Sequence, residues 1–212
     1  MMLEASILRR IETAFGHDRG FPQPTFYAFA NALRFDLGGD VEAVGTRFLQ
    51  AFDRARAIAR ALFANSGMLT AVAPHYGYDW PARHRARWQD TLNELGFTMP
   101  FDGCDRTRAD DDPELFCDWY SADFGNDLVL IDALLWANIA RELGVTPKAR
   151  WLPRVFIVDF ERRLILFAYD DRGMDVIAMA REPLQPIYDQ FGDWLLDYDR
   201  ARMDERFAAR VD

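Results

Sequence analysis

The spacing of apolar residues divides the chain into helical and extended segments. Apolar positions recur every three or four residues over 3–15, 40–64 and 128–143, which predicts three helices. The third is apolar on nearly all sides, so we expect it to be buried. A further helix is predicted over 84–95. Asp40 directly precedes the second helix and is a residue type that favours helix N-termini, so we expect it to cap that helix.

The helix predicted over 40–64 has two kinds of face. One is an apolar stripe suited to a core, formed by Val44, Phe48, Phe52, Ala55, Ala59 and Leu62. The other carries a row of arginines, Arg47, Arg54, Arg56 and Arg60. A binding face is one interpretation of this row, but a solvated helix surface is the more economical one.

Strand patterns occupy much of the remaining sequence. Apolar and polar residues alternate over 32–37, and a short strand is predicted at 68–76. Three apolar runs at 155–160, 164–169 and 175–179 are separated by turn sequences, as in an antiparallel meander. Helix-forming residues return after this meander, with a break expected at Gly192. The sequence therefore predicts a single α+β domain over 1–212, with helices packed against a mainly antiparallel sheet that has a C-terminal β-meander.

Composition narrows the class of protein. The 212 residues are 50% hydrophobic, as in globular proteins, and carry a formal net charge of -9. This charge argues against nucleic-acid binding, which needs a basic face. A cationic protein partner would complement it, but an acidic surface that serves solubility alone explains the same charge and is the more economical interpretation. The N-terminus lacks a signal-peptide pattern, and no apolar run is long enough to span a membrane. We therefore expect a cytoplasmic protein without membrane contacts.

The acidic residues are densest between 102 and 127. This stretch contains nine Asp or Glu residues and only two arginines. Its first half is predicted to be a loop and its second half a strand. The acids of the loop, Asp110, Asp111, Asp112 and Glu114, are the candidate partner-binding residues.

Two C-terminal motifs, "YDDRGMD" and "WLLDYDR", repeat a mixture of acids, arginine and aromatic residues. Their charged members are Asp170, Asp171, Arg172, Asp175, Asp197, Asp199 and Arg200. Converging carboxylates could bind a divalent cation, but charge pairing between the motifs explains the same pattern without a metal. Asp171 and Gly173 also suit a type I turn closed by a left-handed glycine. We favour the structural interpretation.

Motifs for nucleophilic or metal-dependent catalysis are missing from the sequence. The three histidines, His17, His75 and His84, lack metal-ligand spacing, and neither GxSxG nor a Walker loop occurs. The acids around Cys104 would raise the pKa of its thiol and weaken it as a nucleophile. No catalytic residue, metal ligand or cofactor is predicted.

Four stretches of the chain resemble the bacterial domain-of-unknown-function family 3885 (DUF3885). They are "TFYAFANALRFDLG", "RFLQAFDRARAIARALF", "YDDRGMDVIA" and "LQPIYDQFGDWLLDYDR". The specific portion is about residues 150–205. Residues 65–150 are similar only in outline, and the acidic loop departs from the family's pattern. The resemblance implies a cytosolic bacterial domain with no settled activity or catalytic residues.

These observations favour a non-catalytic binding protein, of the kind that inhibits a basic toxin as immunity proteins do. An alternative is a metal-dependent enzyme that uses the C-terminal aspartates on a phosphorylated or nucleotide-like substrate. A third is a structural subunit or homodimer without a ligand. The sequence does not determine the oligomeric state.

Overall fold

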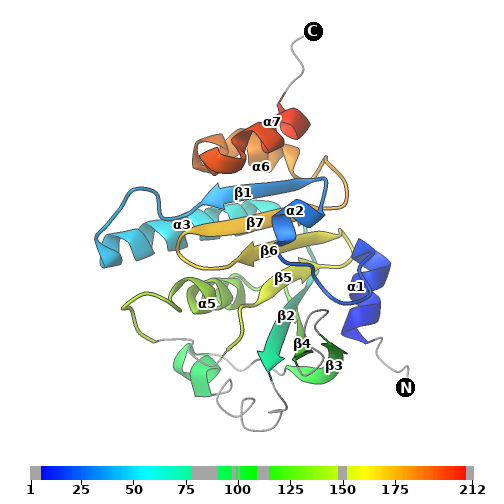
Figure 1. Cartoon of the computed structure of the whole chain (residues 1–212). Coiled ribbons are helices and arrows are strands. Elements are labelled where there is room, and N and C mark those ends of the chain that lie inside the picture. The colour runs from blue at the N-terminus through cyan, green and yellow to red at the C-terminus, as the bar shows by residue number, and fades with distance from the viewer. Residues whose placement is uncertain are drawn as a thin grey trace.

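The structure is a computed structural model that describes residues 6–77, 90–96, 99, 101–108, 115–147 and 152–208. Seven strands in these ranges form one antiparallel sheet in the order β1-β7-β6-β5-β2-β4-β3 (Figure 1). The strands are β1 (Ala32–Asp36), β2 (Met68–Gly77), β3 (Asp102–Arg108), β4 (Phe116–Gly125), β5 (Phe156–Asp159), β6 (Leu164–Ala168) and β7 (Gly173–Ala178).

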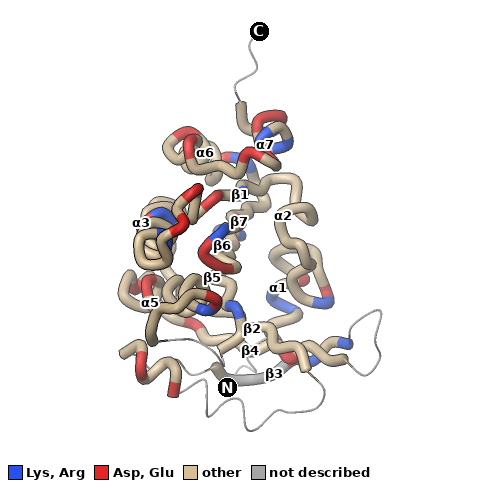
Figure 2. The backbone as a smooth tube through the Cα atoms, turned by 60° about the vertical axis from the view of Figure 1, so that its left-hand side comes forward, with Lys and Arg blue, Asp and Glu red and all other residues tan. Residues whose placement is uncertain are grey.

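Helices cover both faces of this sheet. The longer pair, α3 (Val44–Leu62) and α5 (Leu128–Ile139), packs on one face, and α1 (Ile7–Phe15) and α2 (Thr25–Ala28) lie on the other (Figure 2). Beyond β1 lie two helices and two 3₁₀ turns, α6 (Gln185–Gln190), η1 (Gly192–Trp194), η2 (Asp197–Asp199) and α7 (Arg200–Phe207). The C-terminal segment reaches the outer edge of β1, where Leu196 N–H donates to Arg34 C=O at 2.9 Å.

The predicted α+β class and the C-terminal meander are both confirmed. Strands β5, β6 and β7 follow one another in the chain and pair antiparallel side by side. Every residue of these three strands is buried. Helices on both faces leave no solvated side, which is why the strands read as continuous apolar runs.

The structure corrects three predicted boundaries. Helix α3 starts at Val44 after Ala43, which offers no side-chain cap, so Asp40 lies outside the helix and caps nothing. Helix α5 ends at Ile139, before the predicted end at residue 143. The expected loop at the start of the acidic stretch contains β3, because pairing with β4 satisfies its backbone although its own sequence is polar.

Two further expectations meet the limits of the described residues. Of the helix predicted over 84–95, residues 90–94 are helical and 84–89 lie outside the described ranges. The backbone of Cys104 belongs to β3, but its side chain is outside the described part of the structure. The side chain of Cys117 is buried. In the described ranges, no helix combines the length and the apolar character that crossing a membrane requires.

Candidate functional site

Arg34 holds together two acids from the two C-terminal motifs. Its side chain leaves β1 opposite Asp175 of β7, and Nε and Nη2 donate to the two carboxylate oxygens at 2.7 and 3.0 Å. Its Nη1 lies 3.3 Å from Asp199 Oδ2. One acid of each motif, Asp175 of "YDDRGMD" and Asp199 of "WLLDYDR", therefore meets the other, as the pairing hypothesis requires, but through an arginine from neither motif.

Helix α2 completes the surroundings of this Arg34 cluster. Phe26 N–H donates to Asp175 at 3.3 Å, and the Tyr27 hydroxyl donates to Asp199 at 2.8 Å. The Arg34 guanidinium lies over the Phe26 ring, 4.6 Å from its centroid. Each carboxylate thus has donors besides Arg34, which is the condition under which a buried ion pair is tolerated.

Burial and charge shift the proton affinities of this cluster in opposite directions. Burial raises the pKa of Asp175 above its usual value, although Arg34 and the Phe26 N–H act to lower it. Burial also acts to lower the pKa of Arg34, but the hydrogen bonds and charge of Asp175 outweigh it and raise that pKa. One arginine faces two carboxylates, so the cluster holds an excess negative charge in a poorly hydrated place.

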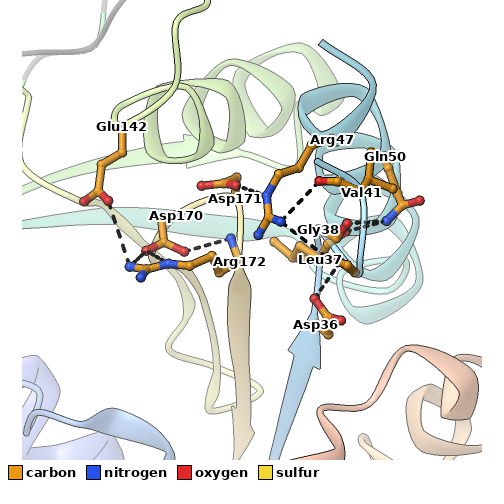
Figure 3. Close-up of polar contacts among 11 residues, drawn as sticks. Asp36, Leu37, Gly38, Val41, Arg47, Gln50, Glu142, Asp170, Asp171 and Arg172 are labelled. Carbon is orange, nitrogen blue, oxygen red and sulfur yellow. Dashed lines mark hydrogen bonds and ion pairs between the residues drawn. The ribbon is translucent and has the colours of Figure 1, made fainter. Parts of the chain in front are cut away.

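The other two acids of "YDDRGMD" lie in the turn between β6 and β7 (Figure 3). Asp170 accepts a hydrogen bond from Arg172 N–H at 2.8 Å and pairs with the Arg172 guanidinium. Asp171 points the other way and pairs with Arg47 of α3. Glu142 lies 3.9 Å from Arg172 and extends the network beyond the turn.

Gly173 has a different role from the predicted one. Its φ is not in the left-handed range, so the turn does not close with a left-handed glycine. A Cβ at this position would overlap the Tyr169 hydroxyl and would lie 3.0 Å from Tyr169 Cε2. Glycine is required here because the Tyr169 ring packs against the backbone.

The arginine row of α3 is not a freely solvated surface. Arg47 contacts the carbonyl groups of Gly39 and Val41 at 3.3 and 3.4 Å, in addition to Asp171 (Figure 3). Arg54 donates to Asp36 C=O at 2.9 Å. Arg56 and Arg60 both pair with Asp132 of α5, at 3.0 and 3.3 Å. These arginines connect α3 to the end of β1, to the loop that precedes the helix and to α5.

Arg200 and Asp197, the remaining predicted charges, contact neither the Arg34 cluster nor the charged residues of the β6–β7 turn. Arg200 pairs with Asp204 at 2.8 Å within α7. Asp197 is exposed, and no hydrogen bond or ion pair links its side chain to another described residue. Across the described ranges, no group of three His, Cys, Asp or Glu residues could hold a metal ion.

The acidic stretch is divided between structural residues and the candidate partner residues. Leu8 N–H donates to Asp105, Arg106 pairs with Asp118, and Arg10 pairs with Asp123. Asp127 caps α5 by accepting from Val129 N–H at 2.8 Å. The candidate partner residues Asp110, Asp111, Asp112 and Glu114 lie outside the described residues, between strands that pair with each other as far as Arg108 and Phe116.

Sequence reasoning missed Arg34 and assigned Arg47 to a solvated face. Arg34 is flanked by apolar residues in an alternating strand, which is the ordinary pattern of a polar position facing solvent. Its side chain is only 12% exposed. The available signal was an arginine inside a predicted strand, in a chain whose C-terminal motifs are rich in aspartate. This signal does not identify which of those aspartates Arg34 contacts.

Comparison with known proteins connects the chain to a family. The family model described as "Domain of unknown function (DUF3885)" matches residues 7–199. A stretch of 46 residues is 41% identical to "Uncharacterized protein YnaE" of Bacillus subtilis (strain 168), and it covers 22% of this chain and 22% of that protein. No solved structure matches the chain.

Proposed function

The chain belongs to the DUF3885 family, and we propose that it is a non-catalytic cytoplasmic protein that binds a cationic protein partner. The partner class is a basic toxin, which the chain would inhibit as immunity proteins do. Asp110, Asp111, Asp112 and Glu114 would occupy the cationic, phosphate-binding face of that toxin and exclude its substrate.

This proposal rests on the difference between the acids that have structural partners in the fold and those of residues 110–114. The formal net charge is -9, yet the buried acids of the two C-terminal motifs, Asp170, Asp171, Asp175 and Asp199, are all bonded to arginines. Asp105, Asp118, Asp123 and Asp127 also serve the fold. Residues 110–114, with four acids among five residues, are the densest run of acids in the chain and are separate from these structural acids.

The position of this run along the chain supports the same proposal. It joins β3 to β4, and β3 is the last strand of the sheet. A connection at the edge of a rigid sheet is a common place for binding residues.

The metal-dependent alternative gains no comparable support. Its five aspartates divide between the Arg34 cluster, the β6–β7 turn and the exposed Asp197. Carboxylates that neutralise arginines are poorly placed to donate oxygens to one cation.

The test compares two variants that carry equal net charge. The first replaces Asp110, Asp111 and Asp112 by Asn and Glu114 by Gln. The second neutralises four exposed acids elsewhere, Asp40, Glu42, Asp193 and Glu205. Tagged wild type and both variants are used to capture partners from a lysate of the source bacterium, and captured proteins are identified by mass spectrometry.

We expect wild type and the second variant to retain one basic protein at low salt, and the first variant to lose it. Raising the salt to about 1 M should release it, because the Debye length falls to about 3 Å. Co-expression of wild type or of the second variant, but not of the first variant, should then relieve the toxicity of that protein. Equal capture by both variants, or capture that does not depend on salt, would refute the role of residues 110–114.

A further inference from the structure

The end of β2 lies beside the part of β4 to which the acidic run of residues 110–114 connects. The described pairing of β5 with β2 covers residues 70–72, whereas β4 pairs with β2 as far as Gly77, opposite Phe116 (Figure 1). Residues 74–77 of β2 therefore project beyond β5. Glu114, the last acid of the run, precedes Phe116 by only two positions in the sequence.

Tyr76 is the large side chain that this projecting end exposes. It is 52% exposed, although residues 69–73 of the same strand are all buried. Its backbone is paired with Cys117 of β4, so the ring stands on a rigid element. Tyrosine is enriched among the residues that dominate the binding energy of protein interfaces. The exposed Tyr76 ring is thus suited to contact a partner that the acidic run attracts.

Tyr76 and the acids of residues 110–114 act over different distances. Partial burial, and then Cys117, raise the pKa of the Tyr76 hydroxyl to about 12, so the side chain is neutral at physiological pH. A neutral ring stabilises a complex only on contact, through buried area and the removal of water. Charges act farther, over a Debye length of about 8 Å at physiological ionic strength.

The nearest arginine of β3 that is paired with β4 does not compete for this contact. Arg106 and Asp118 belong to the row of cross-strand partners next to that of Tyr76 and Cys117, so they lie on the opposite face of the sheet. Arg106 is also paired with Asp118, at 2.6 Å. A basic partner can therefore approach Tyr76 without meeting this charge.

Two other arginines restrict what can contact Tyr76. Arg141 and Arg154 line the same pocket as Tyr76, and Arg154 is paired with Glu142. Guanidinium groups at this pocket disfavour a lysine or arginine of the partner at the same point. The side chain that meets Tyr76 is therefore a neutral one, apolar or aromatic, and the cations of the partner face the acidic run.

We propose that Tyr76 is the short-range anchor of the partner-binding surface, where it packs against an apolar or aromatic side chain of the basic partner, while Asp110, Asp111, Asp112 and Glu114 attract that partner from a distance. The inference rests on the proposed function, because it concerns the same partner. The acids then set mainly the association rate constant, and Tyr76 sets mainly the dissociation rate constant.

The experiment measures both rate constants by biolayer interferometry with the full-length protein immobilised. The probe is the basic protein that wild type retains from the lysate, purified after mass spectrometry has identified it. Wild type is compared with Tyr76→Ala, Tyr76→Phe, Met68→Ala and the variant that lacks the charges of residues 110–114. Met68 is the matched control, because it is 56% exposed at the opposite end of the same strand.

Tyr76→Ala should raise the Kd roughly tenfold to a hundredfold, mostly through faster dissociation. The salt dependence of its association should match that of wild type, because no charge is removed. Tyr76→Phe keeps the ring and should bind within about threefold of wild type. Met68→Ala should bind as wild type does. The variant without the charges of residues 110–114 should associate more slowly at low salt, with little change in its dissociation rate constant.

A second substitution separates lost contact from lost folding. Tyr76→Gln keeps a long side chain at this half-exposed position, so it should fold even if Tyr76→Ala does not, and it should lose the same affinity. Thermal midpoints of all variants show that each is folded at the temperature of the measurement.

The outcomes distinguish this inference from the proposed function. A basic protein that binds Tyr76→Ala or Tyr76→Gln within about twofold of wild type would overturn the anchor role alone. Slower association without faster dissociation, or an equal loss in Met68→Ala, would also overturn it. If wild type retains no basic protein, the proposed function fails and the anchor role fails with it.

Discussion

Arg34 and Asp175 lie directly opposite each other on neighbouring strands, with Arg34 Nε 2.7 Å from Asp175 Oδ1. They are 141 positions apart in the chain. The pair joins the edge strand β1 to the meander, and Asp199 adds the C-terminal segment through the same guanidinium. The Arg34 side chain thus links strand β1, the meander and the C-terminal segment, which are distant from one another in the sequence.

Replacing Arg34 by Met should therefore be strongly destabilising. Two buried carboxylates would lose their common cation, and we expect the free energy of unfolding to fall by about 3–5 kcal/mol. Urea denaturation measures this loss. Adding Asp175→Asn to Arg34→Met should recover part of it, because one of the stranded charges is removed. A single-variant loss below about 1 kcal/mol, the value of an exposed pair, would contradict the inferred burial of the cluster.

The pH dependence of stability should reveal the raised pKa of Asp175. A carboxyl with a higher pKa in the folded than in the unfolded state takes up protons on folding, so its contribution to stability grows as pH falls through the folded pKa. The free energy of unfolding of wild type minus that of Asp175→Asn should accordingly increase from pH 7 towards pH 4. Denaturation at several pH values tests this. A difference that shrinks on acidification would show that Arg34 depresses the pKa of Asp175.

Gly173→Ala should destabilise the β6–β7 turn through crowding. The added Cβ would overlap the Tyr169 ring, and overpacking of this kind costs about 1–3 kcal/mol. In a Tyr169→Leu background, Gly173→Ala should lower the free energy of unfolding by less, because the obstructing ring is gone. Gly45→Ala is the matched control, since a Cβ there meets nothing within 4 Å. It lies in helix α3 and should stabilise the protein by up to about 1 kcal/mol. Equal effects at both glycines would exclude crowding as the cause.

The pairing of Asp171 with Arg47 predicts energetic coupling between the turn and α3. In a double-mutant cycle of Asp171→Asn and Arg47→Met, we expect a coupling free energy of about 1–3 kcal/mol by urea denaturation. Asp193→Asn, at an exposed position, is the control and should couple to Arg47→Met by less than about 0.5 kcal/mol. Additive effects of Asp171→Asn and Arg47→Met would contradict a structural pairing of the two residues. The hypothesis that Asp171 binds a metal would then be the next to test.

Local patterns were sufficient for most of the elements. The meander was predictable because β5, β6 and β7 are short apolar runs separated by turn sequences, and each run is decided by its own residues. Prediction failed at β3, whose polar sequence becomes a strand only because β4 lies beside it. It failed also at the start of α3, where Asp40 has a capping side chain but Val44 begins the helix.

The sequence by itself determined the α+β class, the meander and the charge of the protein, since these depend on residue types and on short periodicities. Only the tertiary structure decided which charges meet. Asp175 and Asp199 converge on Arg34 because β1 adds to the sheet beside β7, far from its sequence neighbours. Partners of this kind are set by long-range packing, which no local period encodes.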